Sequence, residues 1–289
     1  MFSQLKIFIQ LTRLNKPIGI MLLFWPCSWG LAYSSALNIS INQFLYYLLL
    51  FFLGSVLMRS AGCIVNDIVD KDFDKKIKRA KMRPLAAKKI TVKKASIYAI
   101  ILCLIAFIIL IQFNQLTIFL GLASMILAFS YPFMKRITFW PQLFLGLTFN
   151  WGIIMAWTSI NNSLSLEIML LYLSAIFWTI GYDTIYGTQD IKDDEIIGLK
   201  STSIKFKKKL KVFVGFNYFL FLSLQLYIFK SNLGLNFFSL LCIILLLSLM
   251  VQLLVLNKKK PQSCLFAFKL NNISGFLLFL IILQTNFIS

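Results

Sequence analysis

Nine long apolar runs divide this chain, and they constrain its fold more than any other feature. They cover residues 17–37, 43–63, 95–112, 116–133, 139–160, 164–187, 211–229, 235–256 and 270–288. Each is close to the length of about 20 apolar residues that an α-helix needs to cross a bilayer. None has the alternating pattern of a membrane β-strand. The sequence therefore predicts an all-α membrane protein with about nine transmembrane helices, and it argues against a soluble enzyme.

The basic residues predict the orientation of these helices. Of the 29 Lys and Arg residues, 28 fall in the N-terminal segment or in alternate loops, and Lys230 alone falls on the other side. Because basic loops stay in the cytoplasm, we expect a cytoplasmic N-terminus and an external C-terminus. Loops that face anionic lipid then account for the net charge of +19, and no nucleic-acid partner is expected.

The chain is expected to form a single domain over residues 1–289. Residues 3–14 have helical apolar spacing, so the segment 1–16 is expected to lie on the cytoplasmic surface, whereas residues 17–289 form the bundle. Only residues 112–115 separate the third and fourth runs, which predicts a tight helical hairpin. Nothing in the sequence indicates an obligate protein partner. The absence of a transit-type leader favours the bacterial inner membrane over the mitochondrial one for this multi-pass protein.

Acidic residues are rare in this chain and strongly concentrated. Nine of the ten lie in two short segments at the ends of the second and sixth runs, and only Glu167 lies elsewhere. In the first segment Asp67, Asp70 and Asp74 are three and four residues apart, which places them on one face of a helix.

The second acidic segment repeats this arrangement. Asp183, Asp190 and Asp194 are seven and four residues apart, and Tyr186 and Gly187 stand at the intermediate turn. On one continuous helix these carboxylates also share a face. The sequence therefore predicts two carboxylate stripes on two helices.

The two stripes predict a magnesium site. Carboxylates are costly below a membrane surface, and like charges on one face repel each other, so a divalent cation is the natural compensation. The chain has no His, and oxygen ligands suit Mg²⁺, which joins carboxylates to substrate phosphates. The alternative is that the acids pair with nearby lysines. The expected metal ligands are Asn66, Asp67, Asp70, Asp74, Asp183, Asp190 and Asp194, of which the six aspartates are also the expected catalytic residues.

Polar and basic residues near both clusters are candidates for substrate binding. Arg can bind phosphate or carboxylate through two hydrogen bonds, and Lys acts as a point charge. Ordinary loop charge is an equally good explanation for Arg83, Arg136 and Lys200, and the better one for the lysine runs at 207–209 and 258–260. The candidates are Asn66, Lys71, Arg79, Arg83, Lys135, Arg136, Tyr186 and Lys200.

Four segments of the chain resemble the UbiA family of intramembrane aromatic prenyltransferases. The two aspartate motifs of that family resemble NDIVDKDFDKKIKRAKMRPL at 66–85 and GYDTIYGTQDIKDDEIIGLKST at 181–202. The members that prenylate 4-hydroxybenzoate resemble the chain further at 17–36 and 131–157. Lys71 stands where these relatives often have Arg, and Gly187 where they often have Ala. The last three runs carry no such motif.

The resemblance implies a nine-helix bundle around a central cavity that opens sideways to lipid. It implies Mg²⁺-dependent transfer of a polyprenyl group from its diphosphate to the carbon ortho to the hydroxyl of 4-hydroxybenzoate, a step of ubiquinone biosynthesis. The metal ligands named above match the family's two motifs, and Tyr186 lies inside the second. Arg136 or Arg83 is expected to bind the carboxylate of 4-hydroxybenzoate.

Three alternatives remain open at this point. The first is prenyl transfer to another acceptor, such as haem, a naphthoate or a chlorophyll precursor. The second is a CDP-alcohol phosphotransferase, although the compact motif of that class is absent. The third is a cation transporter, although transporter sites lie near the membrane midplane and these clusters lie at helix ends.

Overall fold

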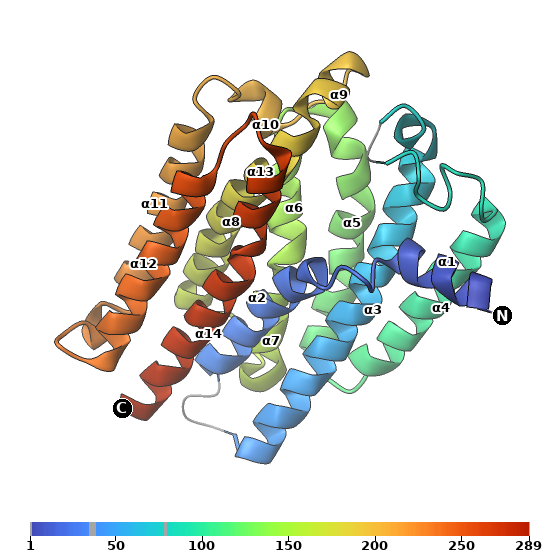
Figure 1. Cartoon of the computed structure of the whole chain (residues 1–289). Coiled ribbons are helices and arrows are strands. Elements are labelled where there is room, and N and C mark those ends of the chain that lie inside the picture. Colours follow the sequence, from blue (N-terminus) through green and yellow to red (C-terminus); the bar gives the residue numbers. More distant parts are fainter. Residues whose placement is uncertain (1, 35–38, 78–79, 289) are drawn as a thin grey trace.

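The computed structural model describes residues 2–34, 39–77 and 80–288, and these ranges contain helices and no strand (Figure 1). The helices pack side by side, and most of the connections between them lie at the two ends of the bundle. They are α1 (Phe2–Thr12), α2 (Ile18–Ser34), α3 (Ile41–Asp74), α4 (Val92–Leu110), α5 (Gln115–Ile137), α6 (Pro141–Phe149), α7 (Trp151–Asn161), α8 (Leu166–Gly187), η1 (Thr188–Asp190), α9 (Ile191–Ile196), α10 (Thr202–Lys205), α11 (Leu210–Ile228), η2 (Lys230–Asn232), α12 (Phe237–Val255), α13 (Pro261–Lys269) and α14 (Asn271–Ile288).

The prediction of an all-α membrane bundle is confirmed. Among the described residues, eight helical segments are long and apolar enough to cross a membrane, counting α6 with α7, α8 with α9 and α13 with α14 as one each. The ninth apolar run contains α2, which at 17 residues is slightly shorter. Because α2 is shorter, a count of nine spanning helices stays a prediction, and so does the orientation of the termini.

The predicted hairpin is also present. Helix α4 ends at Leu110 and α5 begins at Gln115, with Asn114 as the N-cap residue. The side-chain oxygen of Asn114 accepts a hydrogen bond from the backbone N–H of Thr117 at 2.9 Å. This bond satisfies one of the free N–H groups in the first turn of α5, so the sequence marks the start of the helix.

The fifth apolar run, expected to be one helix, is broken at Asn150. Its side-chain Nδ2 donates to the carbonyl of Gly146 at 2.8 Å and to Oγ1 of Thr179 on α8, also at 2.8 Å. A side-chain amide that binds a carbonyl of its own helix competes with the backbone ladder. The break therefore separates α6 from α7 and ties both to α8.

The contact between α2 and α7 is one of the closest in the bundle. A Cβ atom added to Gly30 of α2 would lie 2.3 Å from the carbonyl oxygen of Ile153 on α7. Small residues allow membrane helices to approach each other in this way.

Replacing Gly30 with Ala should therefore destabilise the bundle. We expect the free energy of unfolding to fall by about 1–3 kcal/mol or more, because the new methyl group meets a backbone carbonyl that has no room to move. Thermal unfolding of the detergent-solubilised protein measures the loss. Gly54→Ala is the matched control, since a Cβ there meets nothing within 4 Å. Equal unfolding midpoints for the two variants would contradict the prediction.

Helix α1 packs along the outside of the bundle and brings its end to the site described below. Leu11 is fully buried among residues that include Ile64 of α3 and Ala95 of α4. Just after α1, Arg13 adopts the left-handed backbone region with φ +57°. This conformation is uncommon for a residue other than Gly, so the surrounding contacts hold it in place.

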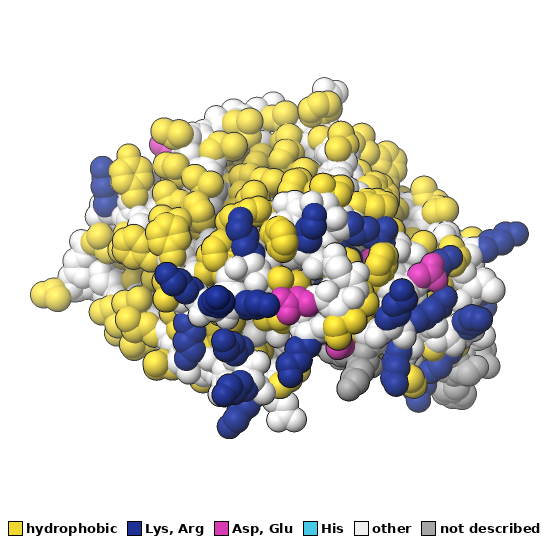
Figure 2. Space-filling view, turned by 90° about the horizontal axis from the view of Figure 1, so that it is seen from above, with side chains coloured by type: hydrophobic (Ala, Val, Ile, Leu, Met, Phe, Trp, Pro, Cys, Tyr) yellow, Lys and Arg dark blue, Asp and Glu magenta, His cyan; other side chains and the backbone are white. Residues whose placement is uncertain are grey.

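One end of the bundle is strongly basic. Figure 2 shows this end, where Lys and Arg side chains gather around a few acidic ones. The basic residues lie in the connections that the sequence assigns to one side of the membrane. This end also carries the two acidic segments.

Candidate active site

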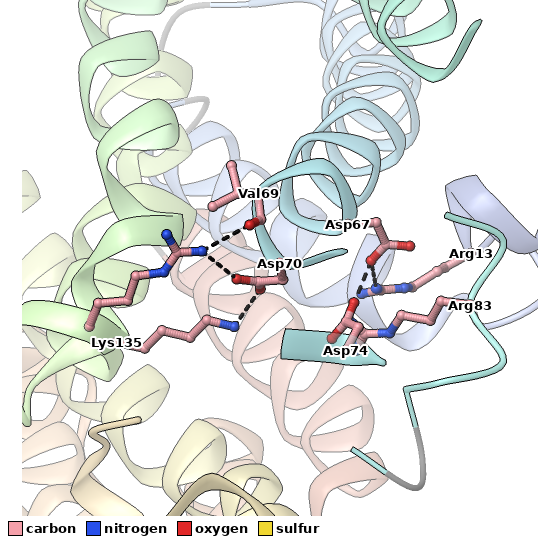
Figure 3. Close-up of polar contacts among 8 residues, drawn as sticks. Arg13, Asp67, Val69, Asp70, Asp74, Arg83 and Lys135 are labelled. Carbon is pink, nitrogen blue, oxygen red and sulfur yellow. Dashed lines mark hydrogen bonds and ion pairs between the residues drawn. The ribbon is translucent and has the colours of Figure 1, made fainter. Parts of the chain in front are cut away.

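The first acidic cluster occupies the last turns of α3. Asp67, Asp70 and Asp74 are all buried, with exposed fractions of 1%, 5% and 3%. Asp67 and Asp74 point to one side of α3, toward Arg13 and Arg83, whereas Asp70 points to the other side, toward α5 (Figure 3). The three predicted carboxylates thus contact basic residues in two directions from α3.

Two arginines hold the Asp67 side of this cluster. The Nη2 of Arg13 lies 2.5 Å from Oδ1 of Asp67. The Nη1 of Arg83 lies 3.3 Å from the same oxygen and 2.8 Å from Oδ2 of Asp74. Burial lowers the pKa of Arg13, but Asp67, Asp74 and the other acidic groups around it together outweigh that effect and hold the pKa above its ordinary value.

Two residues at the end of α5 hold Asp70. Lys135 forms an ion pair with Oδ2, and the Nη2 of Arg136 lies 3.3 Å from Oδ1. Arg136 also donates to the carbonyl of Val69 at 2.9 Å, and its guanidinium lies over the ring of Phe73. In this first cluster, therefore, the acids do pair with basic neighbours, as the alternative reading of the sequence proposes.

The first cluster nevertheless retains a free ligand atom. Oδ2 of Asp67 is buried and has no hydrogen-bond partner, and an unsatisfied buried carboxylate oxygen is costly. Within the described ranges, no three Asp, Glu, His or Cys side chains gather closely enough to hold a metal by themselves. The nearby ligand atoms are all oxygens, and one of them is free. Such a site fits a hard cation whose other ligands are supplied by a substrate and by water.

The second acidic cluster lies at the end of α8. Asp183 is in α8, Asp190 is in η1 and Asp194 is in α9, so a 3₁₀ turn interrupts the continuous helix that the sequence predicts. The three carboxylates therefore lie on three consecutive elements. The seven residues from Asp183 to Asp190 do not follow an α-helix throughout, because the last of them form the 3₁₀ turn. Gln142 of α6 forms a side-chain hydrogen bond with Asp183.

Polar contacts fix α8 from two sides just before Asp183. Thr179 accepts from Asn150 at the break between α6 and α7. The indole Nε1 of Trp178 donates to Oδ1 of Asn271, the first residue of α14, at 2.8 Å. Asn150 and Asn271 are both fully buried, and hydrogen bonds between buried helices resist rotation more sharply than apolar packing does. The position of Asp183 is therefore set by the break at Asn150 and by the start of α14 at Asn271.

A close contact explains why Gly stands at position 187, where relatives often have Ala. A Cβ at Gly187 would lie 2.7 Å from Oγ of Ser203, which donates to the carbonyl of Thr184 at 2.8 Å. The α10 segment thus sits directly on the end of α8. Gln142 Oε1 strengthens this contact by accepting from the backbone N–H of Thr202 at 3.0 Å.

The structure brings the two clusters together. The hydroxyl of Tyr131 on α5 interacts electrostatically with Asp70 of the first cluster and with Asp183 of the second. On the other side, Arg13 interacts both with Asp67 and with Tyr186 of the second motif. The two motifs are 116 residues apart from Asp67 to Asp183 and face one another across these shared neighbours.

The remaining candidates lie nearby or outside the described residues. The Nζ of Lys200 donates to the carbonyl of Ile137 at 3.1 Å, which joins the loop after α9 to the end of α5. Asn66 lines the cavity described next, and Lys71 is partly exposed on α3. Arg79 lies outside the described residues.

A large apolar cavity lies inside the bundle and reaches Asn66, the residue before Asp67, and Tyr131. Its volume is about 610 Å³, and it is lined by residues of α2 to α7. Leu104 of α4 and Leu122 of α5 line it and are also 59% and 51% exposed, so the cavity opens between these helices. A volume of this size holds a drug-sized ligand, and a longer hydrocarbon chain would continue outward between α4 and α5.

Arg59 is a cation inside this cavity. It lies well within α3, although the sequence places it among the loop charges, and its guanidinium is 5.3 Å from the centre of the Phe149 ring. A Cβ at Gly19 would lie 2.7 Å from its Nε, so the small residue makes room for it. Arg59 interacts electrostatically with Asp183 and Asp67. Neither Arg59 nor Arg13 was predicted as a site residue.

These features together define a class of protein. An apolar cavity open to lipid leads to a charged end where carboxylates, arginines and lysines converge, so the bundle suits a membrane enzyme acting on a lipid with an anionic head group. The chain belongs to the UbiA prenyltransferase family, whose family model matches residues 23–273. This membership removes the phosphotransferase and transporter alternatives.

Three similar curated proteins share one name. A Bos taurus protein named "4-hydroxybenzoate polyprenyltransferase, mitochondrial" is 39% identical, over 96% of this chain and 75% of its own. Its Homo sapiens counterpart is 38% identical over the same shares, and its Arabidopsis thaliana counterpart is 42% identical over 80% of this chain and 57% of its own.

Solved structures share the fold. A UbiA homologue from Aeropyrum pernix superposes with a TM-score of 0.76 at 21% identity, covering 92% of this chain and 97% of that one. A UbiA homologue from Archaeoglobus fulgidus, solved with GPP and Mg²⁺, has a TM-score of 0.72 at 16% identity, covering 96% and 99%. That structure thus contains both a divalent cation and a prenyl diphosphate.

The comparisons correct one prediction. A bacterial inner membrane was predicted, but these curated relatives are mitochondrial enzymes of eukaryotes. A helical bundle with one basic end is equally suited to either membrane, so its physical features do not distinguish the two. The prediction of a bacterial location is therefore wrong.

Proposed function

We propose that this chain transfers a polyprenyl group from polyprenyl diphosphate to the carbon ortho to the hydroxyl of 4-hydroxybenzoate, in ubiquinone biosynthesis. The observation that carries the proposal is the meeting of two acidic clusters at the charged end of an apolar cavity. The cavity suits the prenyl chain, and the clusters suit its diphosphate. The names of the similar curated proteins favour 4-hydroxybenzoate over haem or a naphthoate as acceptor.

Mg²⁺ is the cation that we assign to the clusters. When bound, it would neutralise the diphosphate and make it a better leaving group. The free Oδ2 of Asp67 supports this assignment, and an all-oxygen donor set suits Mg²⁺. The proposed ligands are Asn66, Asp67, Asp70, Asp74, Asp183, Asp190 and Asp194.

Basic side chains would bind the diphosphate from both sides of α3. Arg13 and Arg83 lie beside Asp67, and Lys135 and Arg136 lie beside Asp70, so their charges can turn to an incoming phosphate without a large movement. Charge placed in advance at the leaving group lowers the barrier for its departure. Lys71, Tyr186 and Lys200 complete the proposed substrate-binding set. The whole chain then acts as one domain, to which the N-terminal segment contributes Arg13.

Arg59 is our choice for the carboxylate of 4-hydroxybenzoate, in place of the predicted Arg136 or Arg83. Arg83 and Arg136 lie on the acids of the first cluster, where we assign them to the diphosphate. Arg59 instead points into the cavity, where a planar guanidinium can bind a carboxylate through two hydrogen bonds. Holding the acid end there would turn the ring carbon toward the prenyl C1.

The reaction then needs no strong base. The C1–O bond breaks and its electron pair leaves with the diphosphate, which gives an allylic cation that the rings of Tyr131 and Phe149 at the cavity wall can shield. The acceptor ring forms the new bond to C1. Its ring proton passes to the released diphosphate or to water, because restoring aromaticity drives the loss. A chain with no His can support this chemistry.

One assay tests the proposal. Membranes that contain the chain are incubated with Mg²⁺, a labelled polyprenyl diphosphate and 4-hydroxybenzoate, and the product is identified by mass spectrometry. We expect 3-polyprenyl-4-hydroxybenzoate. A naphthoate in place of 4-hydroxybenzoate should give no product. If the naphthoate were prenylated and 4-hydroxybenzoate were not, the proposed acceptor would be refuted.

The cavity should also set the preferred donor length. Gly54 lines it, and a Cβ there meets nothing within 4 Å, so Gly54→Phe would place a ring in the path of the chain. We expect kcat/KM for a long-chain donor to fall about tenfold or more relative to geranyl diphosphate. Leu49→Phe is the control, because Leu49 is exposed on the same helix. An equal loss for both donors would mean that the chain does not pass Gly54.

A further inference from the structure

Two lysine runs that are far apart in the sequence meet at the basic end of the bundle. Residues 207–209 connect α10 to α11, and residues 258–260 connect α12 to α13. The Nζ of Lys258 donates to the backbone carbonyl of Lys207 at 3.4 Å. Similarly, the Nζ of Lys211 donates to the carbonyl of Leu254 at 3.4 Å. These bonds hold the two connections side by side.

The lysine cluster formed in this way carries an unbalanced charge. It consists of residues 207–209, Lys211 and residues 258–260, all lysines and all exposed. Within the described part of the chain, its one ion pair joins Lys207 to Glu195 at 2.5 Å. Like charges held together repel each other, so an anion that bridges the two connections would stabilise them. Each run alone is ordinary loop charge, and the packing makes them one site.

The surface beneath the lysine cluster is apolar. Val212 and Phe216 of α11 are 69% and 58% exposed, and Leu254 of α12 is 77% exposed. Helix α11 packs mainly against α8 and α12 mainly against α14, so α11 and α12 contact each other much less. A molecule at this position would meet cations at one end and a hydrocarbon surface along the rest of its length.

We propose that the lysine cluster binds the phosphate head group of an anionic phospholipid whose acyl chains lie against α11 and α12. Clusters of four to eight Lys or Arg at a membrane end are typical of such recognition. The site would be separate from the proposed active site, because it lies on the connections flanking α11 and α12 and not on α3, α5 or the end of α8. The prenyl diphosphate is therefore not its expected ligand.

Lipid titration of the purified full chain tests the proposal. The thermal unfolding midpoint is followed in a nonionic detergent as dioleoyl phosphatidylglycerol or dioleoyl phosphatidylcholine is added. The test variant is K258Q/K259Q/K260Q. The control variant, K88Q/K89Q/K93Q, removes the same charge from exposed lysines elsewhere on the basic end. Prenyl transfer in phosphatidylcholine should be unchanged in both, since neither set belongs to the proposed active site.

We expect phosphatidylglycerol, and not phosphatidylcholine, to raise the midpoint of the wild type and of the control. The test variant should need at least fivefold more phosphatidylglycerol for half of the effect, because each lysine near an anionic surface strengthens binding about fivefold. If both variants responded equally weakly to phosphatidylglycerol, the lipid would be attracted by the overall positive charge of the basic end, and the proposed site would be overturned. No response of the wild type to phosphatidylglycerol would overturn it too, as would full stabilisation by soluble glycerol phosphate, which lacks acyl chains.

Discussion

Replacing Asp67 with Asn should abolish prenyl transfer while leaving the bundle folded in the membrane. We expect kcat to fall by about 10²–10³-fold or more, the range seen when one preorganised electrostatic contact is lost at a reacting centre. Asp67 is 1% exposed, and it combines a buried free oxygen with an oxygen bound by two arginines. Asn keeps the shape but removes the negative charge that both a cation and Arg13 require.

The control for this variant lies five residues further along the same helix. Asp72 is exposed, pairs with Lys75 at 2.7 Å and points away from the cluster. Asp72→Asn should therefore keep nearly full activity. Steady-state kinetics in membranes compare the two variants, and detergent extraction followed by size-exclusion chromatography checks that each is folded. Near-normal activity of Asp67→Asn would remove the first cluster from the mechanism.

Removing divalent cations should abolish activity without unfolding the protein. In excess EDTA we expect prenyl transfer to fall to background and to return on addition of Mg²⁺, because the diphosphate then loses its main charge neutralisation. The fold should survive, since the acids of the first cluster keep their pairs with Arg13, Arg83 and Lys135. The thermal midpoint should therefore stay within a few degrees, which is a small change in unfolding free energy for a chain of this size.

EDTA that is already saturated with Mg²⁺ serves as the control, and it should leave the rate unchanged. Full activity in free EDTA would exclude a metal role for both clusters. A collapse of the thermal midpoint in EDTA would instead mean that the cation is structural, and that the ion pairs around Asp67 and Asp70 do not hold the end of α3 by themselves.

The sequence predicts the helices and the acids well because both depend on local patterns. Apolar runs mark helices wherever lipid is the solvent, and the concentration of acids marks the two motifs without any knowledge of the fold. The break at Asn150 is different, because it depends on the Thr179 hydroxyl contributed by α8. A contact between two elements that are distant in the sequence produces no periodic pattern from which it could be predicted.

Arg13 and Arg59 illustrate the same limit at the site. Both are counted as ordinary basic residues when only charge and position along the chain are considered. Arg13 becomes a site residue because α1 packs on α3 and α4 and the chain then turns with a positive φ. Arg59 becomes one because Gly19 leaves room for it inside the bundle and the ring of Phe149 packs against its guanidinium. Each role depends on packing partners that are distant in sequence.

The cavity is lined by α2 to α7, whereas the polar contacts that fix α8 come from Asn150, between α6 and α7, and from Asn271 of α14. Mutations in the walls near Gly54 or Leu104 can therefore alter which donor fits while leaving the setting of Asp183 intact. Such a division lets related enzymes diverge in side-chain length without rebuilding their chemistry. It also offers a route to redesign, in which a library confined to α3, α4 and α5 would retain a working second acidic cluster in most of its members.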